Sequence, residues 1–267
     1  MNALNDIRFS QTPNAASPKY PLFHIYWTEA RLELLRLLRL PSFALPSLLF
    51  PAMFYLLFGV LMGGENRRAF ATYLLATYSI FGVMGPGLFG FGVSVAIDRE
   101  HGALTWRRAL PSIAAAYFVA KMLMAMAFAV FIFVQLALLG STLGGVQLQA
   151  LQWLQLLGIS LLAALPFCAL GLVIGTLVSA AAAPAVVNFI YLPMAFLSGL
   201  WIPITMLPDF IKQLAPLWPS YHAAQLALRV IGQDSGGAPW LHFTYLIGFS
   251  LIMLWLATLL WSRMKLK

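Results

Sequence analysis

Long apolar runs separated by short polar stretches dominate this sequence. Six of the runs reach the roughly 20 residues that a helix needs to cross the hydrocarbon core of a bilayer. The pattern therefore predicts an all-α integral membrane protein. The short stretch that ends at Pro184 leaves two possibilities for the fourth and fifth runs, a tight reversal or a break within one long apolar region. The predicted spans cover about residues 42–62, 71–97, 114–140, 152–178, 184–203 and 240–262.

Composition agrees with this class. The chain has 267 residues, of which 61% are hydrophobic and 9% are charged, whereas about 25% of the residues of a soluble domain are charged. Little soluble mass is expected beyond a disordered cytoplasmic tail over residues 1–23, and residues 24–267 form one transmembrane domain. The basic residues do not cluster on a soluble unit, so the net charge of +8 gives no indication of nucleic-acid binding.

Lysine and arginine positions predict the orientation, because cytoplasmic loops carry an excess of these residues. With the N-terminus inside and six spans, twelve of the 16 basic residues fall on the inner side and four on the outer side. The opposite orientation reverses these numbers. Both termini are therefore predicted to be cytoplasmic, with Lys121 counted among the inner charges.

A separate element precedes the first span. Residues 24–40 form an amphipathic helix in which Glu29, Glu33 and Arg36 share one face at 100° per residue, while Trp27 and several leucines share the other. Such a helix is suited to lie in the membrane interface. The alternative is a cytoplasmic start to the first span. Near the other end of the chain, residues 204–239 are apolar but broken by proline, which predicts short re-entrant or surface-lying helices.

The sequence carries no signature of an enzyme or a metal site. A Gly-x-x-x-x-Gly-Lys-Ser/Thr motif is absent, so the chain is not expected to hydrolyse ATP. One cysteine and four scattered histidines give neither a disulfide framework nor a metal-ligand spacing. No acidic residue lies in the middle of a predicted span, which argues against a secondary carrier driven by an ion gradient.

Two groups of membrane-depth residues have candidate roles. Gly171 and Gly175 form a small-x-x-x-small pattern, for which a dimer contact is one interpretation. The stronger interpretation is chance, because glycine is common in membrane helices. Polar and aromatic side chains of the second and fifth spans either line a substrate path or pack within the bundle. The candidates for this path are Tyr78, Phe89, Asn188, Tyr191, Phe196 and Trp201.

The most informative segment lies between the second and third spans. Residues 98–111 read Asp-Arg-Glu-His-Gly-Ala-Leu-Thr-Trp-Arg-Arg-Ala-Leu-Pro, a charged, helix-competent stretch at a membrane boundary. It is predicted to be a docking surface for a soluble partner. Aromatic and apolar anchors usually contribute more to such an interface than exposed ion pairs do.

Two stretches carry a family resemblance. One is residues 99–104 followed by Leu110-Pro111 and Lys121, and the other runs from Leu192 to His222 and contains Ser198-Gly199-x-Trp201-x-Pro203. Together they resemble the membrane subunits of ABC transporters of the type-2 permease class. Ala103 and Thr105 depart from that pattern, in which threonine and an acidic residue are frequent. The resemblance implies an interfacial elbow helix, a cytoplasmic coupling helix that enters an ATPase subunit, and short external helices that close the exit path. It assigns the exit gate to Ser198, Gly199 and Pro203, and the coupling contacts to Asp98, Arg99, Glu100, His101, Gly102, Leu104, Trp106, Arg107 and Arg108.

The same resemblance implies a multi-pass subunit of the bacterial cytoplasmic (inner) membrane that forms a homodimer, or pairs with a sister permease, and binds two copies of an ABC ATPase. ATP and Mg²⁺ would bind in that partner, and no cofactor or metal is expected in this chain. The scarcity of membrane-depth charge favours export of a drug, an antimicrobial compound or a lipid. The alternatives are export of a polysaccharide or glycolipid, and an ATP-independent channel or carrier.

Overall fold

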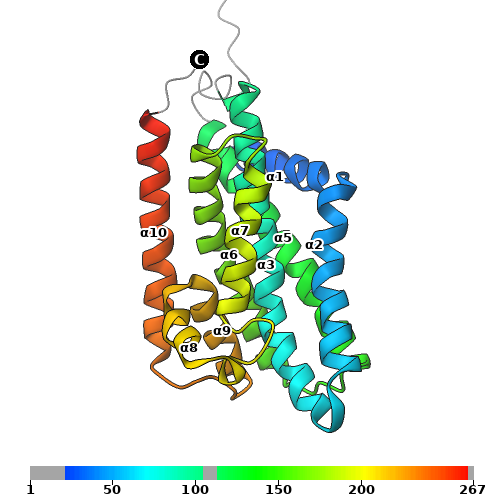
Figure 1. Cartoon of the computed structure of the whole chain (residues 1–267). Coiled ribbons are helices and arrows are strands. Elements are labelled where there is room, and N and C mark those ends of the chain that lie inside the picture. Colours follow the sequence, from blue (N-terminus) through cyan, green and yellow to red (C-terminus); the bar gives the residue numbers. More distant parts are fainter. Residues whose placement is uncertain (1–21, 105–112, 264–267) are drawn as a thin grey trace, which may run out of the picture.

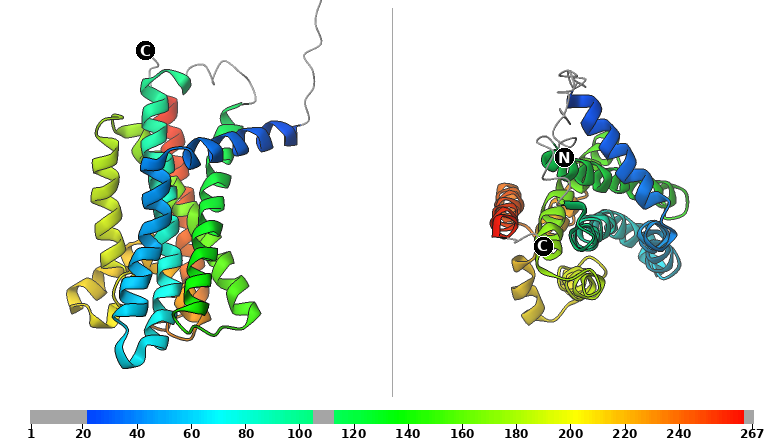
Figure 2. Two further views of the ribbon diagram at one scale, coloured as in Figure 1. Left: turned by 90° about the vertical axis from the view of Figure 1, so that its right-hand side faces the viewer. Right: turned by 90° about the horizontal axis from the view of Figure 1, so that it is seen from above.

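The computed structural model describes residues 22–104 and 113–263, and these residues form a bundle of long helices (Figure 1). Helix α1 lies across one end of the bundle, and the short helices α8 and α9 lie at the opposite end (Figures 1 and 2). The elements in chain order are α1 (Leu22–Leu38), α2 (Pro41–Phe54), η1 (Tyr55–Leu61), η2 (Gly64–Asn66), α3 (Arg67–Glu100), α5 (Ile113–Thr142), α6 (Ala150–Leu177), α7 (Ala183–Leu197), η3 (Ile204–Met206), α8 (Asp209–Leu214), η4 (Ala215–Leu217), α9 (Pro219–Val230) and α10 (Pro239–Arg263).

Five helical segments of the described residues are long and apolar enough to cross a membrane. Four are α3, α5, α6 and α10, and the fifth is α2 continued by the π-helical turn η1. They match five of the six predicted spans and make the protein an all-helical, multi-pass membrane protein. The structure also separates α6 from α7 by a reversal, which agrees with the first of the two possibilities for this region (Figure 1).

The predicted fifth span, 184–203, is wrong in its extent. Helix α7 has 15 residues and ends at Leu197, so it is about 22 Å long at 1.5 Å per residue. It ends there because Gly199 adopts a φ of +75°, a left-handed conformation that glycine adopts readily and that stops a helix. Whether this shorter helix crosses the bilayer remains a prediction.

Helix α3 is the centre of the bundle and packs most closely against α6. A Cβ atom placed on Gly171 would lie 2.8 Å from the carbonyl oxygen of Gly87, and one placed on Gly175 would lie 2.9 Å from that of Gly92. Both distances are shorter than side-chain contacts allow, so glycine lets the two backbones touch. The interpretation of Gly171 and Gly175 as a dimer contact is therefore wrong, because the two residues pack inside one chain.

Helix α1 is a helix as predicted, but its buried side differs from the expected one. Ala30, Glu33 and Leu37 are its buried residues, each with less than 9% of its surface exposed, while Trp27 is 61% exposed. The buried strip thus follows the boundary between the predicted polar and apolar faces. Glu33 was expected among the polar side chains of one face, and it is buried because α5 supplies a charged partner for it, as described below.

Candidate functional site

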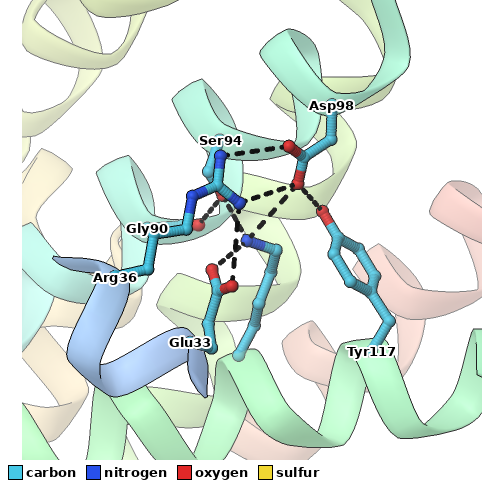
Figure 3. Close-up of polar contacts among 7 residues, drawn as sticks. Glu33, Arg36, Gly90, Ser94, Asp98 and Tyr117 are labelled. Atoms are coloured by element: carbon cyan, nitrogen blue, oxygen red, sulfur yellow. Dashed lines mark hydrogen bonds and ion pairs between the residues drawn. The ribbon is translucent and has the colours of Figure 1, made fainter. Parts of the chain in front are cut away.

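A cluster of charged side chains, all buried except the half-exposed Arg36, joins α1, α3 and α5 (Figure 3). Lys121 of α5 has no exposed surface. Its Nζ atom donates hydrogen bonds to Glu33 Oε1 at 2.5 Å and to Ser94 Oγ at 2.6 Å, and Ser94 Oγ in turn donates to the carbonyl oxygen of Gly90. An ammonium group buried in this way is tolerable only when it is paired and hydrogen-bonded.

Asp98 of α3 is the second anion of the cluster. Its Oδ1 atom lies 3.1 Å from Nη2 of Arg36, and its Oδ2 atom accepts a hydrogen bond of 2.7 Å from the hydroxyl of Tyr117. The Nζ atom of Lys121 lies 3.9 Å from the same Oδ2. Burial of Arg36 opposes its charge, but the hydrogen bond and the charge of Asp98 outweigh this effect and raise the pKa of Arg36. Two anions and two cations thus form one charge-neutral unit, which we call the ion cluster (Glu33, Arg36, Ser94, Asp98, Tyr117 and Lys121).

Sequence reasoning missed most of this cluster. Lys121 was counted as an inner-side charge, yet it lies inside α5 and is fully buried. The available signal was its position within the predicted third span, since an ionisable residue at membrane depth usually has a partner or a function. The sequence does not indicate that Glu33 is the partner of Lys121, because the two residues lie 88 positions apart.

The predicted docking segment begins where the ion cluster ends. Asp98 belongs to the cluster, and Leu104 is only 2% exposed within this chain, so the docking surface does not include them in this conformation. Arg99 donates hydrogen bonds to the carbonyl oxygens of Thr176 and Val178 at the end of α6. Glu100 and His101 are exposed, whereas Gly102 is half-buried with a φ of +73°. Trp106, Arg107 and Arg108 lie outside the described residues.

Glu100 also has a contact within the chain. Its Oε1 atom accepts a hydrogen bond of 2.9 Å from the backbone N–H of Ala180. Together with Arg99, it holds the turn between α6 and α7 against the end of α3. The start of the predicted docking segment is therefore hydrogen-bonded to the reversal between α6 and α7.

A second site lies nearer the middle of the bundle, where α2, α3 and α7 enclose a cavity of about 360 Å³. Its wall is largely aromatic: the ring centroids of Phe81 and Tyr191 lie 5.2 Å apart, and those of Phe81 and Trp201 lie 5.6 Å apart. No charged side chain of the described residues lines it. The lining residues are Ser42, Phe43, Pro46, Ser47, Phe50, Pro51, Phe54, Phe81, Gly82, Gly85, Phe89, Asn188, Tyr191, Leu192 and Trp201.

Four of the six residues predicted for a substrate path line this aromatic cavity, namely Phe89, Asn188, Tyr191 and Trp201. The other two do not. Tyr78 is fully buried behind the wall, with its ring 5.9 Å from that of Phe81, and Phe196 is 37% exposed on α7 outside the lining. The residues of α2 that line the cavity were not predicted from the sequence. The first span is apolar throughout, so nothing distinguishes the face that meets the cavity from the other faces.

The three predicted gate residues lie just beyond this cavity. The Oγ atoms of Ser198 and Ser220 are 2.5 Å apart, which ties the end of α7 to α9. The hydroxyl of Tyr73 donates a hydrogen bond of 2.9 Å to the carbonyl oxygen of Gly199. Pro203 directly precedes η3. The segment between α7 and α9 is thus fixed to α3 and α9, and its role as a gate stays a prediction.

Fold and sites define a class: a polytopic helical membrane protein with an aromatic cavity, an ion cluster at one end, and no metal-binding group of three or more His, Cys, Asp or Glu side chains in the part that the structure describes. Residues 60–259 match the sequence model of the ABC-2 family transporter protein family, and the chain belongs to this family. It is also 28% identical over 228 residues to the "Putative transport permease YvfS" of Bacillus subtilis (strain 168), which covers 84% of this chain and 92% of that protein. Membership makes the chain a permease of an ABC transporter and implies association with an ABC ATPase.

Proposed function

We propose that this permease exports a hydrophobic or amphiphilic compound, such as a drug, an antimicrobial or a lipid, through the aromatic cavity. The uncharged aromatic lining is the observation that carries the proposal. Aromatic side chains offer a large apolar contact area to such a ligand. The amide of Asn188, which has no hydrogen-bond partner among the described residues, is available to one polar group of the ligand.

Helix α3 supplies the mechanical link in this proposal. The same helix lines the cavity at Phe81 and Phe89, carries Asp98 in the ion cluster, and ends at Glu100 beside the predicted docking segment. An ATPase that moves this segment on binding ATP acts on α3 directly and on α1 and α5 through the buried charges. Pro86 lies on α3 between Phe81 and Phe89, so a movement at the Glu100 end reaches Phe89 directly and reaches Phe81 across a point at which the helix can bend.

The full assembly in this proposal has two permease copies and two ATPase copies in the cytoplasmic membrane, with both termini of this chain inside. The ATPases bind ATP and Mg²⁺, and this chain binds no cofactor of its own. Apolar surface on α7 beside the cavity supports a second permease copy as its cover: Phe189 is 81% exposed and Leu192 is 43% exposed. Apolar side chains at membrane depth contact either lipid or a neighbouring helix, and the position of these two beside the cavity is what favours a second copy.

The test uses the permease reconstituted in vesicles with its cognate ATPase. A Cβ atom on Gly85 would meet only the hydroxyl of Tyr191, at 3.9 Å, so Gly85→Leu places its side chain in the cavity. We expect export of a fluorescent amphiphile to fall at least about tenfold while ATPase binding is retained. Gly248→Leu is the matched control, because a Cβ atom on Gly248 meets nothing within 4 Å and the residue is not part of the cavity lining.

The same vesicles discriminate the other functions. Unchanged export by Gly85→Leu would exclude the cavity as the path. Accumulation by the permease alone, driven by an ion gradient, would identify a secondary carrier or channel. A polysaccharide needs many hydrogen-bonding partners, and only five of the 15 lining residues carry a side-chain polar group, namely Ser42, Ser47, Asn188, Tyr191 and Trp201. We therefore expect a soluble oligosaccharide not to compete for export.

A further inference from the structure

A second cavity lies at the opposite end of the bundle from the ion cluster, where α6, α9 and the start of α10 meet. Its volume is about 490 Å³. Arg229 and Gln155 form its polar rim, and Gly158, Ile159, Leu162 and Phe243 form its apolar floor. It shares no lining residue with the aromatic cavity. We call it the rim cavity.

The polarity of the rim cavity changes along the membrane normal. From Gln155 to Leu162 the cavity follows eight residues of α6, and the seven steps between them span about 10 Å at 1.5 Å per residue. Trp240, 62% exposed at the start of α10, is of the type that marks the level of lipid headgroups. A charged rim at headgroup depth, next to an apolar floor, is complementary to an amphiphilic ligand that enters from the bilayer.

The rim can bind a phosphate. Arg229 Nη1 donates to the carbonyl oxygen of Gly237 at 2.8 Å and lies 3.4 Å from Asp234 Oδ2. Its Nη2 and Nε atoms have no partner in the described parts of the chain, and its side chain is 46% exposed. The side-chain amide of Gln155 likewise has no partner there. A planar guanidinium with free N–H groups is well suited to phosphate oxygens.

The neighbouring acid selects the kind of headgroup. Asp234 lines the adjacent cavity and not the rim cavity, but its Oδ2 atom is 3.4 Å from Arg229 Nη1, so an ammonium group next to a phosphate bound at Arg229 can reach it. Its charge also partly neutralises Arg229 and would repel a purely anionic headgroup. The pair therefore complements a headgroup with one phosphate and one ammonium. The apolar floor has room for an acyl chain, since a Cβ atom on Gly158 would meet nothing within 4 Å, and Phe243 is 39% exposed beside it.

From this geometry we propose that the rim cavity is a binding site for a zwitterionic glycerophospholipid of the phosphatidylethanolamine type. The phosphate pairs with Arg229 and Gln155, the ammonium faces Asp234, and one acyl chain lies along Gly158 and Phe243. The bound lipid joins α6 and α9 to α10, a helix with much exposed apolar surface. This site depends only on the membrane embedding of the chain, so its failure would leave the proposed export activity intact.

The test measures binding of dioctanoyl phosphatidylethanolamine to the purified full-length permease by native mass spectrometry. Gly158→Leu fills the floor with a residue that α-helices favour, and we expect it to weaken binding about tenfold or more. Gly248→Leu makes the same change at an open position outside the rim cavity and should bind as the wild type does. Arg229→Gln should weaken binding similarly. Arg229→Lys should weaken it less, because lysine keeps the positive charge and loses only the paired N–H groups of the guanidinium.

Three further ligands separate the parts of the proposal. Dioctanoyl phosphatidylglycerol lacks the ammonium, dioctanoylglycerol lacks both phosphate and ammonium, and inorganic phosphate lacks the chains. We expect each to bind more weakly than dioctanoyl phosphatidylethanolamine, and equal binding of phosphatidylglycerol would overturn the zwitterionic headgroup. Equal binding of the phospholipid by Gly158→Leu and the wild type would overturn the proposal, and so would binding of dioctanoylglycerol as tight as that of the phospholipid. If Gly158→Leu does not elute as a folded species, the comparison of Arg229→Gln with Arg229→Lys decides the question.

Discussion

The ammonium group of Lys121 lies 2.5 Å from the carboxylate of Glu33, although the two residues are 88 positions apart and belong to helices at an angle to each other (Figure 2). Glu33 lies on α1, which crosses the end of the bundle, and Lys121 lies on α5, one of its long helices. This ion pair fastens the elbow-like helix to the membrane-embedded core. Asp98 extends the fastening to α3, the helix that also lines the aromatic cavity.

Removing Lys121 should be strongly destabilising. Lys121→Met leaves the buried carboxylates of Glu33 and Asp98 with one cation in place of two, and breaking a buried ion pair from one side costs about 3–5 kcal/mol. We expect a lower unfolding temperature in detergent, with α1 released first because it loses its main polar anchor. Hydrogen exchange of the α1 amides measures that release.

The double variant Glu33→Gln with Lys121→Met is the control for charge. It removes one charge of each sign, so the cluster stays neutral, and we expect it to recover a clear part of the lost stability. If the double variant is no more stable than Lys121→Met alone, the ion pair is not what holds α1. Comparing ATP hydrolysis with export in the two variants then tests whether the cluster transmits movement.

Arg99 has a structural role that can be separated from docking. Its guanidinium binds the last carbonyl groups of α6, where helix ends leave such groups unpaired. Arg99→Ala should destabilise the permease by about 1–3 kcal/mol, the range for a hydrogen bond to a charged group. Arg99→Lys should lose less, because the charge at the helix end remains.

Measurements of ATPase binding and of thermal unfolding together show whether Arg99 has a structural role or a docking role. Weaker ATPase binding by Arg99→Ala at an unchanged unfolding temperature would contradict the structural role and favour direct docking. Glu100→Ala is the matched variant on the same turn, since Glu100 is exposed and makes a single backbone contact, with Ala180.

The glycine contact between α3 and α6 predicts a steep size dependence. A methyl group at Gly171 would lie 2.8 Å from a backbone oxygen of α3 that cannot move independently. Gly171→Ala should therefore destabilise the protein by about 1–3 kcal/mol through overpacking, despite the better helix propensity of alanine. Gly248→Ala, at an open position of α10, should be neutral or stabilising. Equal unfolding temperatures for the two variants would show that the helices separate easily here.

Much of the helix layout was predictable from the sequence, because a spanning helix is encoded in one continuous apolar run. The end of α7 was not, since it depends on the left-handed Gly199 and on the contact of Ser198 with Ser220 on a later helix. The same distinction applies to the sites. Tyr191 and Trp201 stood out as polar or aromatic residues of the fifth apolar run, whereas Phe54 and Glu33 acquire their positions only when distant helices pack together.

The junction of α9 with α10 should weaken in acid. His222 Nε2 lies 2.9 Å from the carbonyl oxygen of Pro216 and must donate to it. In the neutral ring Nδ1 then accepts, so His242 donates across the 2.8 Å Nδ1–Nδ1 contact. The ring of His222 also stacks on Tyr245 and contacts Tyr221, and the charged groups Asp234 and Arg229 act on its partner His242. Burial, together with the charge of His242, lowers the pKa of His222 below its ordinary value.

Because this pKa is lower in the folded state, the unfolded chain binds more protons as the pH falls, and folding loses stability. The contribution of His222 should be complete above about pH 6.5, the ordinary histidine pKa, and should decline as the pH falls through the lower folded-state value. Unfolding temperatures measured from pH 8 to pH 5 should therefore drop less in His222→Gln than in the wild type. His101→Gln, at an exposed position, should keep the wild-type slope. A slope in His222→Gln as steep as that of the wild type would mean that other groups set the acid sensitivity.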